Sequence, residues 1–171
     1  KDVMLNITGF SDCWGISVIH CPYCHGYEVI GKITGIMANG DMAFDFTKLV
    51  FNLTKEVTLF TNGKSTLNEE QKEKFNQNKI NIIEDEIMEI VHENGQIQKV
   101  ILKNQKEIPL EALYAKIPFT QNISVEDLGI ELNEQGFIKV DMMHKTNIPG
   151  VFACGDNTTM MRSVANAVAQ G

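Results

Sequence analysis

The segment from Gly31 to Val50, "GKITGIMANGDMAFDFTKLV", places a short apolar run, a tight turn and a helical pattern in immediate succession. The apolar run covers residues 32–37 and predicts a buried strand. The turn falls at residues 38–40, after which Met42, Phe46 and Leu49 recur at helical spacing. A strand, a tight turn and a helix in this order predict the first half of a βαβ unit.

The residues that follow continue this alternation. "EVTLFTN" is rich in β-formers and predicts a second strand, and "STLNEEQKEKFNQN" predicts a helix capped by Ser65. A third strand is expected at residues 80–83, an antiparallel meander around the Asn94–Gly95 turn, and a last strand at 112–117. We therefore expect an α/β fold: a Rossmann-like parallel sheet with right-handed crossovers, followed by an antiparallel meander.

The two ends of the chain have weaker patterns. Residues 1–17 are interrupted by glycines and are expected to be irregular. A second zone begins near Pro118. Its patterns predict a hairpin, a short buried strand and a helix, which would lie at 128–141, at 151–154 and from Thr158 or Thr159 onward.

Charge and hydropathy exclude several classes of partner. Lys and Arg total 15 against 22 Asp and Glu, for a net charge of −7. Nucleic acids and anionic membranes both need a basic face, so neither is an expected partner. No apolar run is long enough to span a bilayer, and the first residues contain no signal-peptide core. We expect a cytoplasmic protein.

The stretch "HCPYCHGYE", residues 20–28, carries the strongest chemical signal. Cys21 and Cys24 are three positions apart, so a helix would place them on one face, and Pro22 suits its first position. Cys21 would then cap the helix, where free backbone amides stabilise a thiolate. One sulfur can attack a substrate disulfide while the other resolves the mixed disulfide. His25 adds a group that can protonate a leaving thiolate.

Three other interpretations of the cysteine pair are weaker. Covalent haem attachment also uses Cys-x-x-Cys-His, but it would need an axial ligand and an exported, mostly helical domain. Zinc would need a second pair of ligands, whereas Cys13 and Cys154 stand alone in the sequence. A pair of inert buried cysteines is less typical of this spacing with proline. No metal is expected.

The turn "ANGDMA", residues 38–43, stands where a Gly-x-Gly-x-x-Gly/Ala dinucleotide fingerprint would lie. Gly40 would let a pyrophosphate approach the backbone, at the N-terminus of the helix that Asp41 and Met42 begin. Ala38 replaces the first glycine, however, and the end of the next strand has only Lys64 as a basic residue. A nucleotide site and a turn that no longer binds nicotinamide are about equally compatible with this pattern.

A further candidate is "GVFACGDNTTMMRS", residues 150–163. Gly155 would let the backbone approach a ligand, and Asp156 could accept hydrogen bonds from sugar-like hydroxyls. Taken alone, Gly-Asp before a helix is more typical of a turn and a cap.

Together these motifs resemble one family. "CPYC" before "ANGDMA", with "TNIPGVFACGD" and "MRSVANAVAQG" near the end, is similar to the thioredoxin reductase-like family of FAD-dependent pyridine nucleotide–disulfide oxidoreductases. The resemblance runs over residues 9–171. "CPYCHGYE" looks closest to a branch that holds gliotoxin-type dithiol oxidases and bacterial relatives.

The resemblance implies a domain layout and roles for single residues. Residues 1–15 would link domains, 16–116 would form an NAD(P)-binding-like domain with the redox pair, and 117–171 would belong to the FAD-binding domain. Cys24 would face the flavin and Cys21 would meet the substrate. Asp156 would hold the flavin ribityl chain, and Arg162 and Ser163 would lie beside the flavin ring. His25 falls where the family often has an acid/base aspartate.

The resemblance also implies an activity, a flavin-dependent dithiol/disulfide oxidoreductase that shuttles electrons between the Cys pair and FAD. A thioredoxin-like protein or a small disulfide or dithiol would be its substrate, and it would be a homodimer. NADPH as donor is in doubt, because no arginine set for its 2′-phosphate is present. Two alternatives are an oxygen-using dithiol oxidase and a non-enzymatic redox-sensing or nucleotide-binding module.

The family's N-terminal FAD fingerprint is absent and the last helix is cut at Gly171. We expect the chain to be about the second half of a member, inactive alone, with FAD held by the full-length protein.

Overall fold

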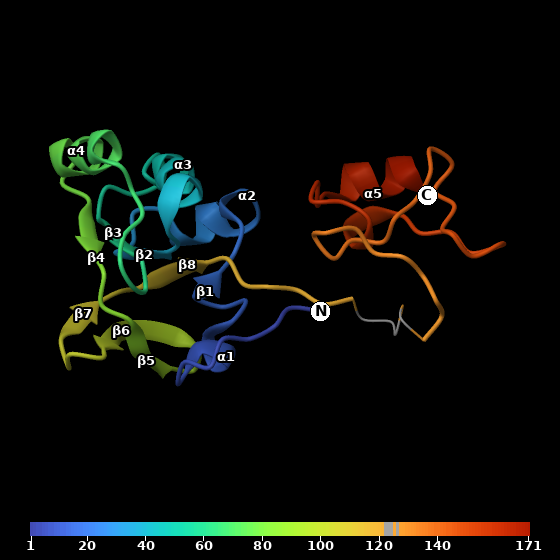
Figure 1. Cartoon of the computed structure of the whole chain (residues 1–171). Coiled ribbons are helices and arrows are strands. Elements are labelled where there is room, and N and C mark those ends of the chain that lie inside the picture. Colours follow the sequence, from blue (N-terminus) through green and yellow to red (C-terminus); the bar gives the residue numbers. More distant parts are fainter. Residues whose placement is uncertain (122–124, 126) are drawn as a thin grey trace. The chain divides into compact units, whose positions relative to one another are not determined.

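The computed structural model describes residues 1–121, 125 and 127–171. It divides the chain into two compact units (Figure 1). The larger unit comprises Met4–Ile117. The smaller comprises Lys1–Val3 and Pro118–Gly171. No helix within the described ranges is both long enough and apolar enough to cross a membrane.

A five-stranded parallel sheet forms the centre of the larger unit. Its strands stand in the order β1-β8-β2-β3-β4. They are β1 (Val18–Ile19), β8 (Ala112–Ala115), β2 (Thr34–Met37), β3 (Val57–Phe60) and β4 (Asn81–Ile83). The predicted βαβαβ order is confirmed, since β2, β3 and β4 are parallel neighbours joined by the helices α3 (Gly40–Val50) and α4 (Glu69–Gln77).

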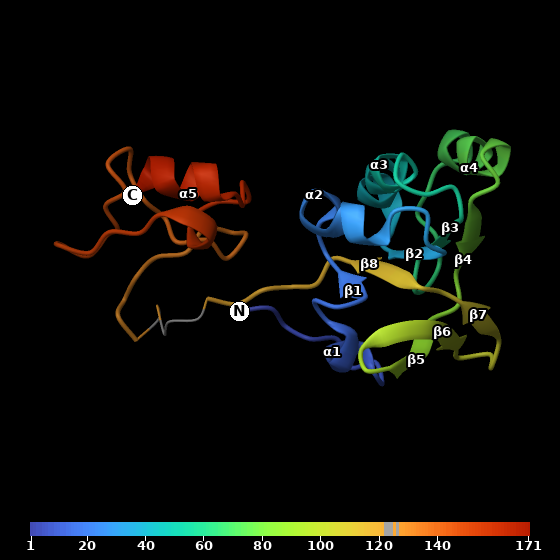
Figure 2. The same ribbon diagram turned by 180° about the vertical axis from the view of Figure 1, so that it is seen from behind.

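Different elements cover the two faces of this sheet (Figures 1 and 2). The helices α3 and α4 lie on one face. The other face packs on a three-stranded antiparallel sheet of β5 (Ile87–Glu93), β6 (Gln96–Leu102) and β7 (Glu107–Pro109). The predicted meander is therefore confirmed. Its turn uses Asn94 and Gly95, both at positive φ, as a tight hairpin requires.

Alternate residues of each buried strand enter different cores. In β2, Ile36 joins the helix-side core while Met37 joins the meander-side core. In β8, Tyr114 and Leu113 divide in the same way. Because successive side chains of a strand point to opposite faces, a sheet covered on both faces needs such apolar residues at every position.

The start of α4 differs from the sequence prediction. Asn68, rather than Ser65, caps the helix: its side chain accepts from the Gln71 backbone N–H at 2.9 Å, and the Gln71 side chain accepts from the Asn68 N–H at 3.0 Å. The Ser65 hydroxyl instead accepts from the Leu67 N–H in the preceding turn. This reciprocal pair is a capping box, and it satisfies two donors that the helix cannot pair itself.

Asn68→Ala is expected to lower the free energy of unfolding by about 1 kcal/mol, because the side-chain oxygen that accepts from the Gln71 N–H is removed. Urea unfolding monitored by circular dichroism measures this difference. Asn76→Ala is the matched control, since Asn76 lies exposed inside the same helix and alanine favours a helix interior. Equal losses in the two variants would contradict a specific role for the cap.

The prediction that residues 1–17 are irregular is wrong for their second half. A short helix, α1 (Phe10–Cys13), buries both of its end residues in the meander-side core. Gly9 precedes it at φ 78°, and the backbone of Thr8 accepts from the Ile90 N–H at 2.8 Å. Two apolar residues three positions apart are too short a pattern to predict a helix.

The smaller unit has little regular structure around a small apolar core of Val125, Ile130, Ile138 and Ala153. The hairpin predicted around Gly136 is present as a turn with one antiparallel bridge, from Leu132 to Ile138. The strand predicted at 151–154 reduces to one bridge between Phe152 and Lys145, and the Phe152 side chain is exposed.

The last helix begins later than predicted. It is α5 (Val164–Gln170), preceded by the short 3₁₀ helix η2 (Gly155–Asn157). The Ser163 hydroxyl caps α5 by accepting from the Asn166 N–H at 3.1 Å. The Thr158 hydroxyl instead donates to the Gly155 carbonyl, and Thr159 accepts from the Met161 N–H. These local hydrogen bonds compete with the helical hydrogen bonds that a helix starting at Thr158 or Thr159 would form.

Candidate redox site

The two cysteines lie at the start of a single helical turn, α2 (Pro22–His25). Cys21 is extended and caps this turn: its sulfur accepts from the Cys24 backbone N–H at 3.3 Å. Pro22 occupies the first helical position, where its missing N–H costs nothing. The local structure is therefore the one that the spacing and the proline predict.

The sulfur atoms of Cys21 and Cys24 are 2.8 Å apart, and both thiols are free. A disulfide has an S–S distance of about 2.05 Å, so less than about 1 Å of movement would close one. The Cys24 thiol donates to the Cys21 sulfur, which raises the pKa of Cys24, and its slight burial and the nearby Cys21 charge act in the same direction. Of this pair, Cys24 is thus held as the protonated donor.

His25 is held by a carboxylate from the next turn. Helix α2 continues into the 3₁₀ helix η1 (Gly26–Val29), where the Glu28 Oε2 lies 3.0 Å from the His25 Nδ1. A carboxylate at this nitrogen favours the tautomer with its proton on Nδ1 and leaves Nε2 to exchange protons. The His25 ring also meets the His20 ring edge-on, with 6.4 Å between centroids.

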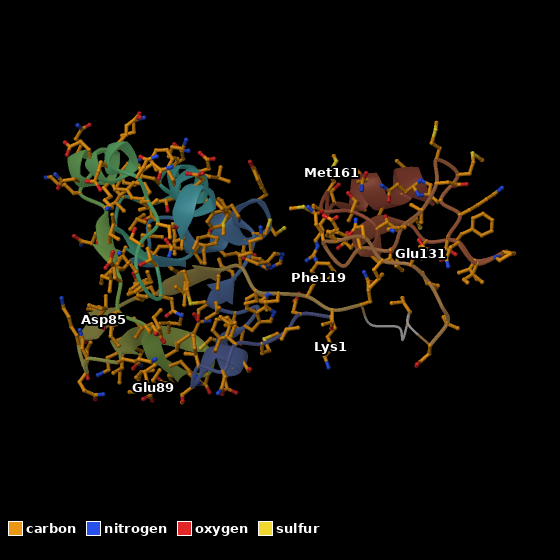
Figure 3. The ribbon with its side chains drawn as sticks, viewed as in Figure 1. Lys1, Asp85, Glu89, Phe119, Glu131 and Met161 are labelled. Carbon is orange, nitrogen blue, oxygen red and sulfur yellow. The ribbon has the colours of Figure 1, made fainter. Side chains whose placement is uncertain are left out.

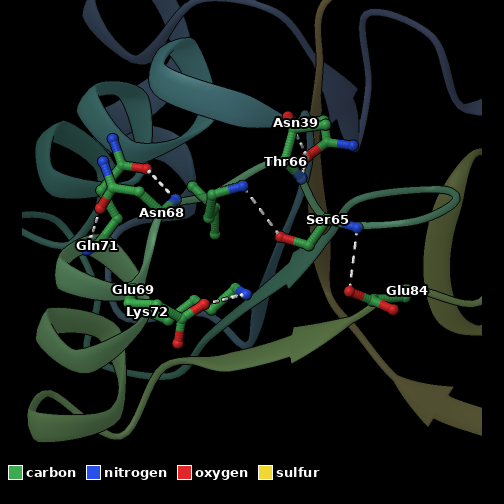
Figure 4. Close-up of polar contacts among 9 residues, drawn as sticks. Asn39, Ser65, Thr66, Asn68, Glu69, Gln71, Lys72 and Glu84 are labelled. Atoms are coloured by element: carbon green, nitrogen blue, oxygen red, sulfur yellow. Dashed lines mark hydrogen bonds and ion pairs between the residues drawn. The ribbon is translucent and has the colours of Figure 1, made fainter.

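The turn between β2 and α3 is filled by the side chains of Asn39 and of Thr66, which lies between β3 and α4 (Figure 4). The Asn39 Oδ1 accepts three hydrogen bonds: from the Gly40 N–H at 2.9 Å, from the Thr66 N–H at 2.9 Å and from the Thr66 hydroxyl at 3.1 Å. The Asn39 amide also donates to the Lys64 carbonyl. A Cβ built on Gly40 would meet the Thr66 hydroxyl at 3.0 Å. We call this set of contacts between Asn39, Gly40 and Thr66 the Asn39 clasp.

Two carboxylates are neighbours of the Asn39 clasp. Asp41, in the first turn of α3, accepts from the Gln71 side chain at 2.7 Å. Glu84 accepts from the Ser65 N–H at 3.0 Å (Figure 4). Met42 is exposed beside Asp41. Carboxylates at this edge would repel a phosphate rather than attract it.

The candidate flavin contacts all lie in the smaller unit. Gly155 is at φ 76°, and its N–H donates to the Gln170 side chain at 2.7 Å. A Cβ there would lie 3.4 Å from the Ala167 Cβ, an ordinary contact, so it is the positive φ that favours glycine here. Ser163 caps α5, as described above.

Three polar groups near α5 fit a polyhydroxyl chain. The Asp156 carboxylate is exposed, and the buried Asn157 Oδ1 has no hydrogen-bond donor among the described residues. Both are acceptors of the type that ribityl hydroxyls need. The Arg162 guanidinium stacks on the Phe119 ring, 4.8 Å from its centroid, next to the exposed Met161 (Figure 3). The acceptor oxygens of Asp156 and Asn157 are therefore of a chemical type that suits the hydroxyl groups of a ribityl chain.

The structure adds residues that the sequence did not single out. Glu28 could have been found from its position three residues after His25. Asn39 and Tyr114 give no local signal, since their roles depend on contacts with distant segments. Within the ranges that the structure describes, no group of three His, Cys, Asp or Glu side chains is placed to hold a metal ion.

Comparisons with known proteins identify the family of the chain. A family model described as pyridine nucleotide-disulphide oxidoreductase matches residues 32–171. Thioredoxin reductase tcpT of Claviceps purpurea is 33% identical over the whole chain, which covers 56% of that relative's length.

Solved structures give the same fold. TrxB of Bacillus anthracis superposes with a TM-score of 0.86 at 25% identity, over 99% of this chain and 57% of the other. An oxidoreductase from Agrobacterium tumefaciens has a TM-score of 0.83 at 30% identity, with the same coverage. The chain thus spans a little over half the length of the relatives it matches. The resemblance expected from the motifs is confirmed, and the chain belongs to the pyridine nucleotide-disulphide oxidoreductase family, with thioredoxin reductase-like relatives.

Proposed function

We propose that the full-length protein is a flavin-dependent dithiol/disulfide oxidoreductase of thioredoxin reductase type, in which electrons pass between the Cys21–Cys24 pair and FAD. One observation carries the proposal: two free sulfurs lie 2.8 Å apart at the start of α2, in a chain of this family. This fragment alone would be inactive, since it spans little more than half of its relatives.

In the direction that oxidises a substrate dithiol, the proposed thiol–disulfide exchange has two steps. A substrate thiolate attacks the Cys21 sulfur of the Cys21–Cys24 disulfide, and Cys24 leaves as a thiolate that His25 can protonate. The second substrate thiolate then attacks the substrate sulfur of the mixed disulfide and releases Cys21. The substrate has lost two electrons, and the cysteine pair has gained them. Bound FAD supplies the two-electron acceptor that restores the pair.

The remaining assignments are part of the same proposal. Residues 16–116 would form the NAD(P)-binding-like domain, and 117–171 would contribute Asp156, Arg162 and Ser163 to the FAD site. The substrate would be a thioredoxin-like protein or a small disulfide or dithiol. The proposed setting is a homodimer in the cytoplasm, where Cys-x-x-Cys pairs are redox-active rather than structural.

The proposal is tested by anaerobic mixing of the oxidised, FAD-loaded full-length protein with dithiothreitol. The visible flavin absorbance should bleach, and full reduction should consume two dithiols per flavin, one for FAD and one for the cysteine pair. The Cys21→Ser variant should keep its flavin oxidised on the same time scale. Equal bleaching in the two proteins would mean that electrons reach the flavin without the cysteine pair.

A second candidate, an oxygen-using dithiol oxidase, is favoured by the Asn39 clasp. The Asn39 oxygen takes the Gly40 N–H, the donor that a pyrophosphate would need, and Thr66 fills the space in front of Gly40. The neighbouring carboxylates of Asp41 and Glu84 add repulsion. The electrons that leave the flavin would then pass to oxygen instead of a nicotinamide.

Asn39→Gly is expected to strengthen NADPH binding about tenfold, because it frees the Gly40 N–H and removes the side chain that occupies the turn. Glycine is a tolerable N-cap, so α3 should remain folded. Stopped-flow reduction of the flavin over a range of NADPH concentrations measures the change. Asn68→Gly makes the same substitution at the cap of α4 and should have no effect. Fast reduction of the wild-type flavin, with no gain in Asn39→Gly, would defeat the oxidase candidate.

A further inference from the structure

Tyr114 carries a buried hydroxyl group that the fold does not use. Its side chain is 1% exposed in the helix-side core, and its ring packs edge-on against Phe46 at 5.7 Å between centroids. Among the described residues, its Oη has no hydrogen-bond partner. Leaving a buried hydroxyl unpaired is unfavourable, and phenylalanine would fill the same space without this penalty.

The hydroxyl lies beneath the redox turn. A Cβ built on Gly26, the residue directly after α2, would be 3.7 Å from the Tyr114 Oη. Strand β8 pairs in parallel with β1 so that Tyr114 stands opposite Ile19. The chain then runs from Ile19 through one residue into Cys21. The strand register therefore brings the phenol to the segment that holds the cysteines.

The charged neighbours of this phenol come from the redox segment. The negative charges of Cys21 and Glu28 act on it, whereas Phe46 on α3 and the core residue Ile36 on β2 are apolar. Burial, with smaller contributions from the negative charges of Cys21 and Glu28, raises the pKa of Tyr114 to about 12. The phenol therefore keeps its proton at any physiological pH, so it acts as a neutral hydrogen-bond donor.

We infer that Tyr114 donates a hydrogen bond, through one water molecule, to the thiolate that forms at Cys21 when the disulfide is reduced. The inference rests on the proposed redox function of the pair. Two electrons from the substrate dithiol break the S–S bond, Cys24 takes a proton from His25, and Cys21 carries the negative charge. The phenolic proton stays on Tyr114 throughout. A charge-assisted bond of this kind would favour the thiolate and give the unpaired hydroxyl its partner.

The test is Tyr114→Phe in the intact, FAD-loaded protein, reduced before alkylation with iodoacetamide. Peptide mass spectrometry follows each cysteine separately over a range of pH. Without the phenol, the midpoint of the Cys21 alkylation profile should move up by about one pH unit, so its rate near neutral pH falls about tenfold. Tyr27→Phe removes an exposed hydroxyl from η1 and is the matched control, with an unchanged profile.

A purely structural role makes a different prediction. If the hydroxyl were only an unpaired group, Tyr114→Phe would raise the melting temperature and leave the Cys21 profile unchanged, and that outcome would overturn the inference. Isotope-labelled tyrosine gives a second readout in the wild-type protein. The NMR signal of the Tyr114 ring carbon that bears the hydroxyl should shift on reduction, and a constant signal would also overturn it. Neither measurement depends on turnover, so the proposed function is judged separately.

Discussion

Cys24→Ser in the full-length protein is expected to lower turnover to below about 1% of wild type, because a serine oxygen cannot form or resolve a disulfide. The same change should remove the flavin–thiolate charge-transfer absorbance, since Cys24 is the proposed flavin-facing sulfur. Steady-state dithiol oxidation and the visible spectrum of the half-reduced protein measure the two effects.

Cys154→Ser is the control for this prediction, since it removes an exposed thiol from the smaller unit and should retain turnover. The spectrum also has an expected pH dependence. The hydrogen bond to Cys21 raises the pKa of Cys24, so the absorbance that needs a Cys24 thiolate should grow as the pH rises through a midpoint above that of free cysteine. Unchanged turnover and absorbance in Cys24→Ser would refute the assignment of this sulfur.

Gly9→Ala is expected to destabilise the larger unit by about 3 kcal/mol, the largest stability effect that we predict. Gly9 has φ 78°, a conformation that alanine adopts only with strain. A Cβ there would also lie 2.2 Å from the Ile90 carbonyl oxygen. Because this obstacle is backbone, the adjacent strand β5 or helix α1 must move to accommodate a methyl group.

Gly15→Ala separates the two causes. Gly15 has nearly the same conformation, at φ 80°, but nothing lies within 4 Å of its Cβ position. This control should lose only about 1 kcal/mol, which is the backbone strain alone. Urea denaturation followed by circular dichroism gives both values. Equal losses in the two variants would show that the Ile90 backbone yields at little cost.

The sequence predicts the larger unit well where the patterns are long. The periodicity of residues 31–60 establishes the βαβ order, and Asn94–Gly95 identifies the hairpin. The sequence prediction fails where several caps compete over a few residues, as at Ser65 against Asn68 and at Thr158 against Ser163. At Ser65, a tertiary contact from its N–H to Glu84 accompanies the later start of the helix, whereas at Thr158 and Thr159 local turns compete with it.

The residues of the candidate site also fall into two groups: those that the local sequence pattern predicts and those that depend on distant contacts. Spacing alone identifies Cys21 and Cys24 and predicts their helical turn. The same reasoning does not reveal that Asn39 is bonded to Thr66, which is 27 positions away, because local sequence does not encode that contact. Tyr114 is also missed, since one tyrosine in a buried strand is usually only a core residue.

The pairing of β1 with β8 has a consequence for how the protein is made. Ile19 and Tyr114 stand opposite each other but are separated by most of the larger unit's chain. Closing so long a loop is entropically expensive and slow, so we expect this pairing to form after the local β2–α3–β3 contacts. During synthesis, the redox cysteines leave the ribosome first yet wait for β8 to complete their surroundings. In that interval the two thiols lack the surroundings that β8 provides, and they can react with oxidants or other thiols in solution.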